Sequence, residues 1–366
     1  MQRVADDESQ EWLSGADPEI LPPAVRAAFP ILDGALELRP VGGGLLHQSF
    51  HARLADSEFI LQRVSDVFAP EIHDNIHRVS SHLAARGFRS ATLLPTVDGQ
   101  YSVDLGTLGR WRLMPHLGGV SFTRVQSLAQ ARSAGLLVGR FHAALRDFEQ
   151  TLAPMGIPYR DTALYLKWLR SALDANPGHR LSGDILPLGN RILSTFVDLG
   201  TPVDAPDCVI HGDLKLQNLL FETATGPGRD RAFALVDMDT LMRAPLWVEM
   251  GDAWRSWCNP DGENAGEARF DLEIFEASFR GFVEGLGRAL SVPERLSLAT
   301  APERVTLELC ARYATDALEE RYFGWDEDRF PARGEHNRLR ASVQWQLFEA
   351  ARASRKEREQ ILSDVL

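Results

Sequence analysis

The sequence predicts an α+β fold of two lobes, a small N-terminal lobe built on a mixed β-sheet and a large, mainly helical C-terminal lobe. Short segments with strand-like alternation occupy residues 36–114, and helical periodicity dominates after Pro115. A length of 366 residues is enough for two hydrophobic cores. We therefore expect three parts: an N-terminal extension (1–34), an N-lobe (35–117) and a C-lobe (118–366), with the connector between the lobes near residues 114–118.

The N-lobe elements follow from local signals. Pro22 and Pro23 favour the start of a short helix through residues 25–29, because proline suits the first helical turn. A further helix is expected to end at Gly87, since glycine commonly follows the last helical residue. Alternation predicts the strands, at 36–38, 49–54, 59–64, 101–105 and 111–114, and the second helix spans 70–86.

In the C-lobe, apolar residues at helical spacing predict the longer elements. Two short apolar runs flank a turn with the sequence Gly-Pro-Gly and therefore predict a hairpin. The expected helices are 127–148, 162–173, 187–198, 271–286, 305–320 and 338–362, and the hairpin strands are 219–221 and 233–236.

Composition argues against several classes of function. A net charge of -12 disfavours binding to nucleic-acid phosphates, which requires clustered lysine and arginine. No apolar run approaches a membrane span, and the polar N-terminus lacks the apolar core of a signal peptide. The three cysteines, Cys208, Cys258 and Cys310, are far apart and have no zinc-binding spacing. We expect reduced thiols in a cytoplasmic protein whose partner is a small molecule, with no nucleic acid and no membrane as partners.

The most informative segment is residues 211–218, His-Gly-Asp-Leu-Lys-Leu-Gln-Asn, which fits the pattern H-x-D-L-x-x-x-N. Asp213 is the candidate carboxylate that orients an acceptor hydroxyl and takes its proton. Lys215 can offset charge that develops on a transferring phosphoryl group. Asn218 and Asp237, the latter directly after an apolar run, offer oxygen ligands to Mg²⁺. Together these residues predict the chemistry of phosphoryl transfer.

These assignments have structural alternatives. A surface turn can contain H-x-D by chance, but the asparagine at the expected offset and the acidic segment downstream favour the functional interpretation. Asp239 is expected either to bind the metal as well or to hold its loop by hydrogen bonds. Glu249 and Asp252 are expected to cap a helix or to hydrogen-bond the backbone of the catalytic loop rather than to act in catalysis.

The N-lobe carries candidate nucleotide contacts. Gly42, Gly43 and Gly44 lie between two strands, where glycine allows backbone N–H groups to approach phosphates, although a bulge or a turn would also explain them. Ser49, just past these glycines, adds a hydroxyl. Met114 is a further candidate, because it begins the connector and nucleotide sites in such arrangements lie in the cleft between lobes.

The predicted strand at 59–64 has no lysine to neutralise phosphate. Gln62 and Arg63 stand there instead and point to opposite faces of the sheet, so only one of them can face the cleft. Arg63 would offer charge, whereas Gln62 would offer only hydrogen bonds. A neutral pair between Gln62 and Asn75 is one candidate replacement for an ion pair.

These motifs resemble the aminoglycoside phosphotransferase/choline kinase superfamily, whose fold is similar to that of protein kinases. The resemblance rests on the glycine loop and on residues 139–145, 211–218 and 236–239. Residues 60–64, 236–255 and 308–323 make it look closest to the N-acetylhexosamine 1-kinase branch, although His47, Gln48 and Ser49 occupy what resembles an Asn-Asp-Thr stretch. The resemblance implies ATP and Mg²⁺ as cofactors and an amino sugar, phosphorylated at its anomeric hydroxyl, as the acceptor.

The same resemblance implies that Arg312, Asp316 and Tyr322 bind the acceptor. Without it, Arg312 and Asp316, one helical turn apart, would suggest an ordinary ion pair on a helix. Two other functions stay open. The chain could be a phosphotransferase for aminoglycosides, choline or another amino alcohol, or it could bind nucleotide without turnover. The sequence does not determine the oligomeric state.

Overall fold

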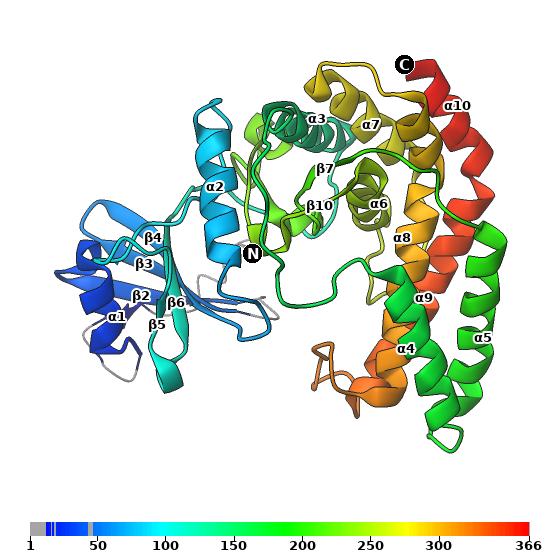
Figure 1. The fold of residues 1–366 in the computed structure, drawn as a ribbon, viewed down its shortest axis with the longest axis horizontal. Coiled ribbons are helices and arrows are strands. Elements are labelled where there is room, and N and C mark those ends of the chain that lie inside the picture. Colours follow the sequence, from blue (N-terminus) through cyan, green and yellow to red (C-terminus); the bar gives the residue numbers. More distant parts are fainter. Residues whose placement is uncertain (1–11, 16, 18–19, 43–46, 366) are drawn as a thin grey trace.

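The computed structural model describes residues 12–15, 17, 20–42 and 47–365. It confirms the predicted fold class, with a β-sheet N-terminal lobe and a helical C-terminal lobe (Figure 1). Helix α2 (Ile72–Ala84) lies between the sheet and the C-lobe, and Ile76 and Leu83 join the largest buried cluster. Within the described part of the chain, no helix is long and apolar enough to cross a membrane.

The N-lobe sheet has the strand order β1-β2-β3-β4-β6-β5, and all neighbouring pairs are antiparallel. One face is apolar, because alternate residues such as Phe50, Leu61 and Leu113 pack with Phe29 and Leu32 from the segment around helix α1. Residues before Leu36, among them Leu21, Val25, Phe29 and Leu32, thus belong to the N-lobe core. The bounds are β1 (Leu13–Ser14), α1 (Pro23–Ala28), β2 (Leu36–Val41), β3 (Gln48–Leu54), β4 (Ser57–Val64), β5 (Val103–Asp104) and β6 (Arg110–Pro115).

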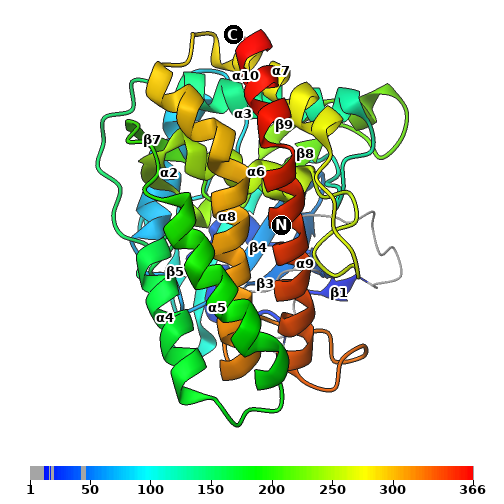
Figure 2. The ribbon, with the colours of Figure 1, turned by 90° about the vertical axis from the view of Figure 1, so that its right-hand side faces the viewer.

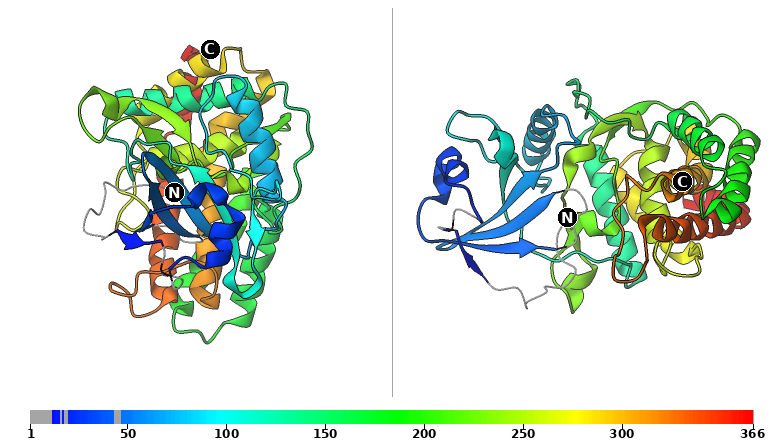
Figure 3. Two further views of the ribbon diagram at one scale, coloured as in Figure 1. Left: turned by 90° about the vertical axis from the view of Figure 1, so that its left-hand side faces the viewer. Right: turned by 90° about the horizontal axis from the view of Figure 1, so that it is seen from below.

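The other face of this sheet carries a row of polar side chains. Ser49 lies opposite Gln62 in the strand register, and Gln62 lies opposite Arg112. Residues paired in this way place their side chains on the same face, so the three lie side by side across β3, β4 and β6. All three are buried. Seen from below, the sheet and the outer helices of the C-lobe lie at opposite ends of the molecule (Figure 3).

Two helices of the C-lobe, α3 (Leu128–Ala144) and α7 (Leu272–Leu286), pack unusually closely through glycine. A Cβ atom at Gly135 would lie 1.9 Å from the carbonyl oxygen of Ser278, and one at Gly281 would lie 1.9 Å from that of Arg132. Both helices were predicted from their apolar spacing and both are confirmed. Glycine is required here because the backbones themselves are in contact.

The remaining long helices pack together on the side away from the sheet (Figure 2). Helix α8 begins at Val292, well before the predicted residue 305, because Ser291 and Glu294 form a capping box and the helix tolerates Pro302 in its interior. The predicted helix 338–362 is two helices, separated at Ser354. The bounds are α4 (Thr162–Ala175), α5 (Ser182–Leu199), α8 (Val292–Glu319), α9 (Arg333–Ala353) and α10 (Arg355–Val365).

Two short strand pairs lie between the lobes and frame the candidate site. The predicted hairpin is confirmed as β8 (Leu219–Phe221) and β9 (Ala232–Leu235), and β7 (Asp207–Ile210) pairs with β10 (Met242–Pro245). Helix α6 (Leu246–Trp257) lies outside the predicted elements. Its polar residues Glu249, Asp252 and Arg255 recur at a spacing of three along one side of the helix, and they are buried rather than exposed to solvent.

Candidate active site

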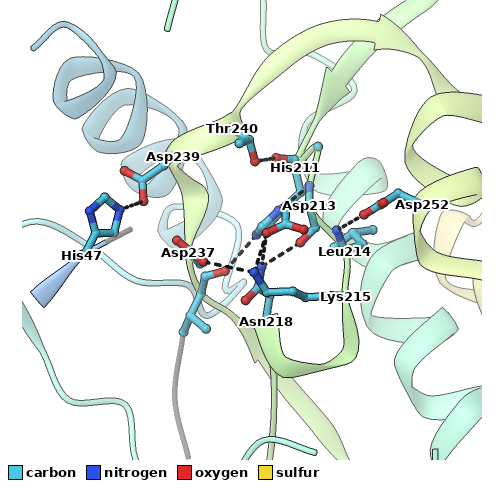
Figure 4. Close-up of polar contacts among 12 residues, drawn as sticks. His47, His211, Asp213, Leu214, Lys215, Asn218, Asp237, Asp239, Thr240 and Asp252 are labelled. Atoms are coloured by element: carbon cyan, nitrogen blue, oxygen red, sulfur yellow. Dashed lines mark hydrogen bonds and ion pairs between the residues drawn. The ribbon is translucent and has the colours of Figure 1, made fainter. Parts of the chain in front are cut away.

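The segment 211–218 forms the turn between β7 and β8 and lies beside the residues that follow β9 (Figure 4). His211 is fully buried, and its Nε2 lies 2.9 Å from the carbonyl oxygen of Val236. This contact joins the loop that contains Asp213 to the segment that contains Asp237. The two halves of the predicted site, which are more than twenty residues apart in sequence, are therefore brought together.

Two buried carboxylates of α6 hold the backbone of this loop. Glu249 accepts hydrogen bonds from the N–H groups of His211 and Gly212, at 2.8 and 2.9 Å, and Asp252 accepts one from Leu214 at 2.9 Å. Buried backbone donors that kept no partner would be costly. The expectation that these two residues hydrogen-bond the backbone of the catalytic loop is confirmed.

Asp213 lies at the centre of a small polar cluster. Lys215 donates to Asp213 Oδ2 at 2.8 Å, its Nζ lies 3.9 Å from Asp237 Oδ2, and the amide nitrogen of Asn218 donates to Asp213 Oδ2 at 3.1 Å. Burial alone would raise the pKa of Asp213, but Lys215 outweighs that effect and holds the pKa well below its usual range. Asp213 is therefore ionised at neutral pH and is suited to align a hydroxyl.

The oxygen donors of Asp237 and Asn218 suit a hard cation. Asp237 has a left-handed backbone (φ 65°, ψ 55°), which is uncommon outside glycine, and its side chain turns toward Lys215 and Asn218 (Figure 4). Because the Asn218 amide nitrogen donates to Asp213, its amide oxygen is the atom that can turn toward a cation. A carboxylate and an amide oxygen are ligands that Mg²⁺ accepts alongside water and phosphate, so the donor set fits this ion.

Asp239 points away from this cluster, toward the N-lobe (Figure 4). Both of its oxygens are bound by Arg112, with Nη2 to Oδ2 at 2.8 Å, and the Nε2 of His47 lies 3.2 Å from Oδ2. The side chains of Arg112 and Asp239 are each 3% exposed. This carboxylate is the counter-ion of Arg112, and the pair joins the N-lobe sheet to the segment after β9. Asp239 also lies with His47 and Asp237 in a group of potential metal ligands whose atoms are within 4.8 Å of one another, so the expectation that it binds metal stays a prediction.

Sequence reasoning missed Arg112. Its Nε donates to Gln62 at 2.8 Å, and Gln62 in turn donates to Ser49 at 2.9 Å. This places a buried cation at the centre of the cleft face, on the strand next to the one that lacks lysine. The sequence did contain a pattern that could have indicated a buried cation: Arg112 is a charged residue between apolar neighbours in a strand that directly precedes the connector.

The structure also resolves the alternatives at Gln62 and Arg63. Gln62 faces the cleft, whereas Arg63 lies on the other face and donates to the carbonyl oxygen of Thr107 at 3.4 Å, so the candidate role of Arg63 at the nucleotide is corrected. The pair between Gln62 and Asn75 does not form, because the Asn75 amide hydrogen-bonds the backbone of Ala153 at 2.8 and 2.9 Å.

A cavity between the lobes joins these elements. Its walls include side chains from the sheet, the connector and the segment after β9, among them Ile60, Gln62, Arg112, Met114, Leu117 and Asp237. Met114 is thus part of this cavity. Gly42 is exposed and borders open space, whereas Gly43 and Gly44 lie outside the described residues.

A second cavity of about 190 Å³ lies next to the catalytic loop, between α4 and the end of α8. Its walls include Arg312 and Tyr322, two of the three predicted acceptor residues. The Arg312 guanidinium lies 4.9 Å from the Tyr165 ring centre, 5.5 Å from that of Tyr322 and 5.9 Å from that of Tyr159. Tyr159 donates to the carbonyl oxygen of Gly212 at 3.1 Å, so the cavity adjoins the loop of Asp213.

Asp316 lines the same cavity but serves the fold. Its two oxygens accept four hydrogen bonds, from the backbone N–H groups of Arg321, Tyr322 and Phe323 and from the amide of Asn337, at 2.7 to 2.9 Å. Four donors fill the usual acceptor capacity of a carboxylate. Asp316 is therefore a cap for the turn after α8, and within the described part of the chain it forms no ion pair with Arg312, which corrects that alternative. Its expected role at the acceptor stays a prediction, since Asp316 lines the cavity.

Comparison with known families agrees with this geometry. Residues 37–290 match the model of the phosphotransferase enzyme family. The chain belongs to this family, and it is a phosphotransferase that acts on the hydroxyl group of a small molecule.

Solved structures share the fold. The microcompartment-associated aminopropanol kinase is 18% identical, with a TM-score of 0.59 over 87% of this chain and 93% of that chain. An amicoumacin kinase in complex with AMP-PNP and Ca²⁺ is 13% identical, with a TM-score of 0.58 over 90% of this chain and 94% of that chain. An ethanolamine kinase of Plasmodium vivax is 10% identical, with a TM-score of 0.55 over 85% and 82%. At these identities the likeness establishes the fold alone.

Proposed function

We propose that this phosphotransferase transfers the γ-phosphoryl group of ATP, with Mg²⁺, to the anomeric hydroxyl of an N-acetylated amino sugar in the cytoplasm. We place the boundary between the lobes after residue 117. ATP would occupy the cavity between them, with the adenine base beside Ile60, Met114 and Leu117. Asn218 and Asp237 would hold the metal ion. Arg112 would supply the cation that strand β4 lacks, since it lines the same cavity.

In this proposal Asp213 binds the acceptor hydroxyl and receives its proton as the oxygen–phosphorus bond forms and the bond from the γ-phosphorus to its bridging oxygen breaks. A low pKa suits this role, because phosphoryl transfer passes through a loose transition state in which the hydroxyl proton leaves late. Lys215, which bridges Asp213 and Asp237, lies where it can offset charge on the phosphoryl oxygens. A bound Mg²⁺ would add charge neutralisation at the phosphates.

The observation that carries the choice of acceptor is the setting of Arg312. The second cavity places this cation among aromatic rings, and it forms no ion pair with a carboxylate of the described residues. The carboxylates nearby are committed, Asp316 to its four donors and Glu319 to Arg321 at 2.6 Å. A guanidinium repels an ammonium group but binds the carbonyl oxygen of an acetamido group, and aromatic rings suit the apolar faces of a sugar.

The alternative acceptor is an amine-bearing alcohol. The solved relatives named above for aminopropanol and ethanolamine favour this class, and the acidic residues in the walls of the second cavity are consistent with it. Nucleotide binding without turnover is less well supported, because Asp213, Lys215, Asn218 and Asp237 are assembled in one cluster.

The test is a phosphorylation assay with a matched set of acceptors, followed by ³¹P NMR. We expect a sugar 1-phosphate from an N-acetylhexosamine, little product from the corresponding free-amine hexosamine, and none from its methyl glycoside, in which the anomeric oxygen is blocked. In Arg312→Met the KM for the sugar should rise at least tenfold while the KM for ATP stays unchanged. Product from ethanolamine or 3-aminopropanol, with none from N-acetylhexosamines, would overturn the choice of acceptor but not the phosphotransferase assignment.

A further inference from the structure

Three side chains that the proposed reaction does not use converge on the cleft face of the N-lobe sheet, near the connector. His51 of β3 lies opposite Ile60 of β4 in the register, and Glu58 precedes Ile60 by two residues, so both share its face. The backbone N–H of His116, in the connector after β6, donates to the carbonyl oxygen of Glu58 at 2.9 Å. Two strands and the connector thus each contribute one metal-binding side chain to one place.

The ligand atoms of these residues have the spacing of a single coordination sphere. His51 Nε2 lies 3.2 Å from Glu58 Oε2, His116 Nδ1 lies 3.0 Å from the same oxygen, and the three ligand atoms all lie within 4.8 Å of one another. Bonds of about 2.0–2.2 Å in a tetrahedral zinc site place neighbouring ligand atoms about 3.3 Å apart. Small movements of the side chains would therefore allow one ion to bind all three.

The surroundings favour a defined site rather than a chance contact. The side chains of His51 and His116 are 3% and 7% exposed, whereas Glu58 is 38% exposed, which leaves an entry path and room for water as a fourth ligand. Arg53 approaches the other oxygen, Glu58 Oε1, at 3.6 Å and its guanidinium stacks on Trp12. Arg53 thus turns Oε2 toward the two imidazoles, as an outer partner of a metal ligand does.

We propose that His51, Glu58 and His116 form a binding site for Zn²⁺, separate from the proposed Mg²⁺ site at Asn218 and Asp237. Two imidazoles and one carboxylate suit zinc, whereas Mg²⁺ and Ca²⁺ require oxygen ligands. His116 lies between Pro115 and Leu117, which both line the interlobe cavity. Bound zinc therefore ties the connector to β3 and β4 and raises the thermal stability of the N-lobe.

The test uses the full chain, freed of metal with a chelator and titrated with ZnCl₂ against a chromophoric zinc chelator, in excess Mg²⁺ to occupy the catalytic carboxylates. We expect one equivalent of zinc to bind and the unfolding temperature to rise with zinc. The affinity for zinc should fall at least tenfold in His116→Ala and in Glu58→Gln. The Glu58→Gln variant is expected to fold normally, because the side chain is partly exposed and glutamine keeps its shape. Co²⁺ in place of zinc should give the visible absorption of a tetrahedral site in the unaltered chain and lose it in both variants.

The control is His82→Ala, because His82 also pairs with a carboxylate, Asp147 at 3.2 Å, but belongs to no group of three potential metal ligands among the residues that the structure describes. This variant should bind zinc as the unaltered chain does. If the unaltered chain binds no zinc, or if His116→Ala and Glu58→Gln bind it with unchanged affinity, the three residues are only a hydrogen-bonded cluster and the proposal is wrong.

Discussion

Replacing Arg112 by methionine tests whether the pair of Arg112 and Asp239 joins the two lobes. Methionine fills a similar volume but leaves the Asp239 carboxylate, 3% exposed, with only His47 at 3.2 Å. Removing one partner of a buried ion pair costs about 3–5 kcal/mol, and the remaining contact with His47 places the expected loss near the lower limit, about 3 kcal/mol. A loss of about 3 kcal/mol corresponds to a factor of roughly 100 in the unfolding equilibrium. With an unfolding entropy of about 2.1 cal/mol/K per residue over 366 residues, it also corresponds to a fall of about 4 °C in Tm.

The assay is urea unfolding followed by circular dichroism, with three variants. Arg63→Met is the matched control, because Arg63 lies on the other face of β4, and it should change stability by less than about 0.5 kcal/mol. Arg112→Met combined with Asp239→Asn removes both charges and should recover most of the loss. The double variant should recover stability but not ATP affinity, because the cation proposed to contact the phosphates is still missing. An Arg112→Met variant within about 1 kcal/mol of the unaltered chain, or a double variant no more stable than Arg112→Met alone, would refute this reasoning.

Three further predictions concern helix packing, pH and the metal. Gly135→Ala should destabilise the chain by about 2–3 kcal/mol in urea unfolding, because its Cβ would lie 1.9 Å from the Ser278 carbonyl oxygen, whereas Gly183→Ala, with no atom within 4 Å, should cause no loss. Burial alone would lower the pKa of His142, but Cys208 and Glu249 outweigh it and raise that pKa to about 9 from an ordinary value of 6.5. Protonated His142 therefore stabilises the folded chain fully below pH 6.5, and this contribution is lost as pH rises through 9. The free energy of unfolding should fall by about 3 kcal/mol over that window in the unaltered chain and by much less in His142→Gln. In Mg²⁺ titrations of activity, Asp237→Ala should raise the Mg²⁺ requirement strongly, whereas Asp239→Ala should mainly lower Tm; the reverse result would return the metal role to Asp239.

The catalytic cluster could be predicted from sequence because its spacing is local. Asp213, Lys215 and Asn218 lie within one turn, and Asp237 follows a hairpin strand that the sequence also indicates. The branch resemblance likewise pointed to Arg312 and Tyr322, which do line the second cavity. Short motifs and strand ends involve residues close together in sequence, which is why the sequence could indicate where these side chains lie; their roles stay predictions.

The pair of Arg112 and Asp239 could not be predicted, because the residues are 127 positions apart and meet only when the lobes meet. The capping role of Asp316 could not be predicted either. Helical spacing suggested an ion pair with Arg312, but spacing within the helix does not show that the following turn folds back onto the carboxylate. Helix α8 was predicted to start at residue 305, because apolar spacing indicated a helix only from there, whereas the capping box at Ser291 starts the helix at Val292 and Pro302 lies in its interior.

The central claim is that Asp213 aligns an acceptor hydroxyl for transfer of a phosphoryl group from ATP. The most direct test is the Asp213→Asn variant, with turnover measured with ATP, Mg²⁺ and the best acceptor from the panel, and ATP binding measured separately by calorimetry. The side chain keeps its size, so we predict a native fold and ATP affinity within about threefold of the unaltered chain, while kcat falls by roughly a hundredfold or more. A correctly folded Asp213→Asn variant with near-native kcat would contradict the account.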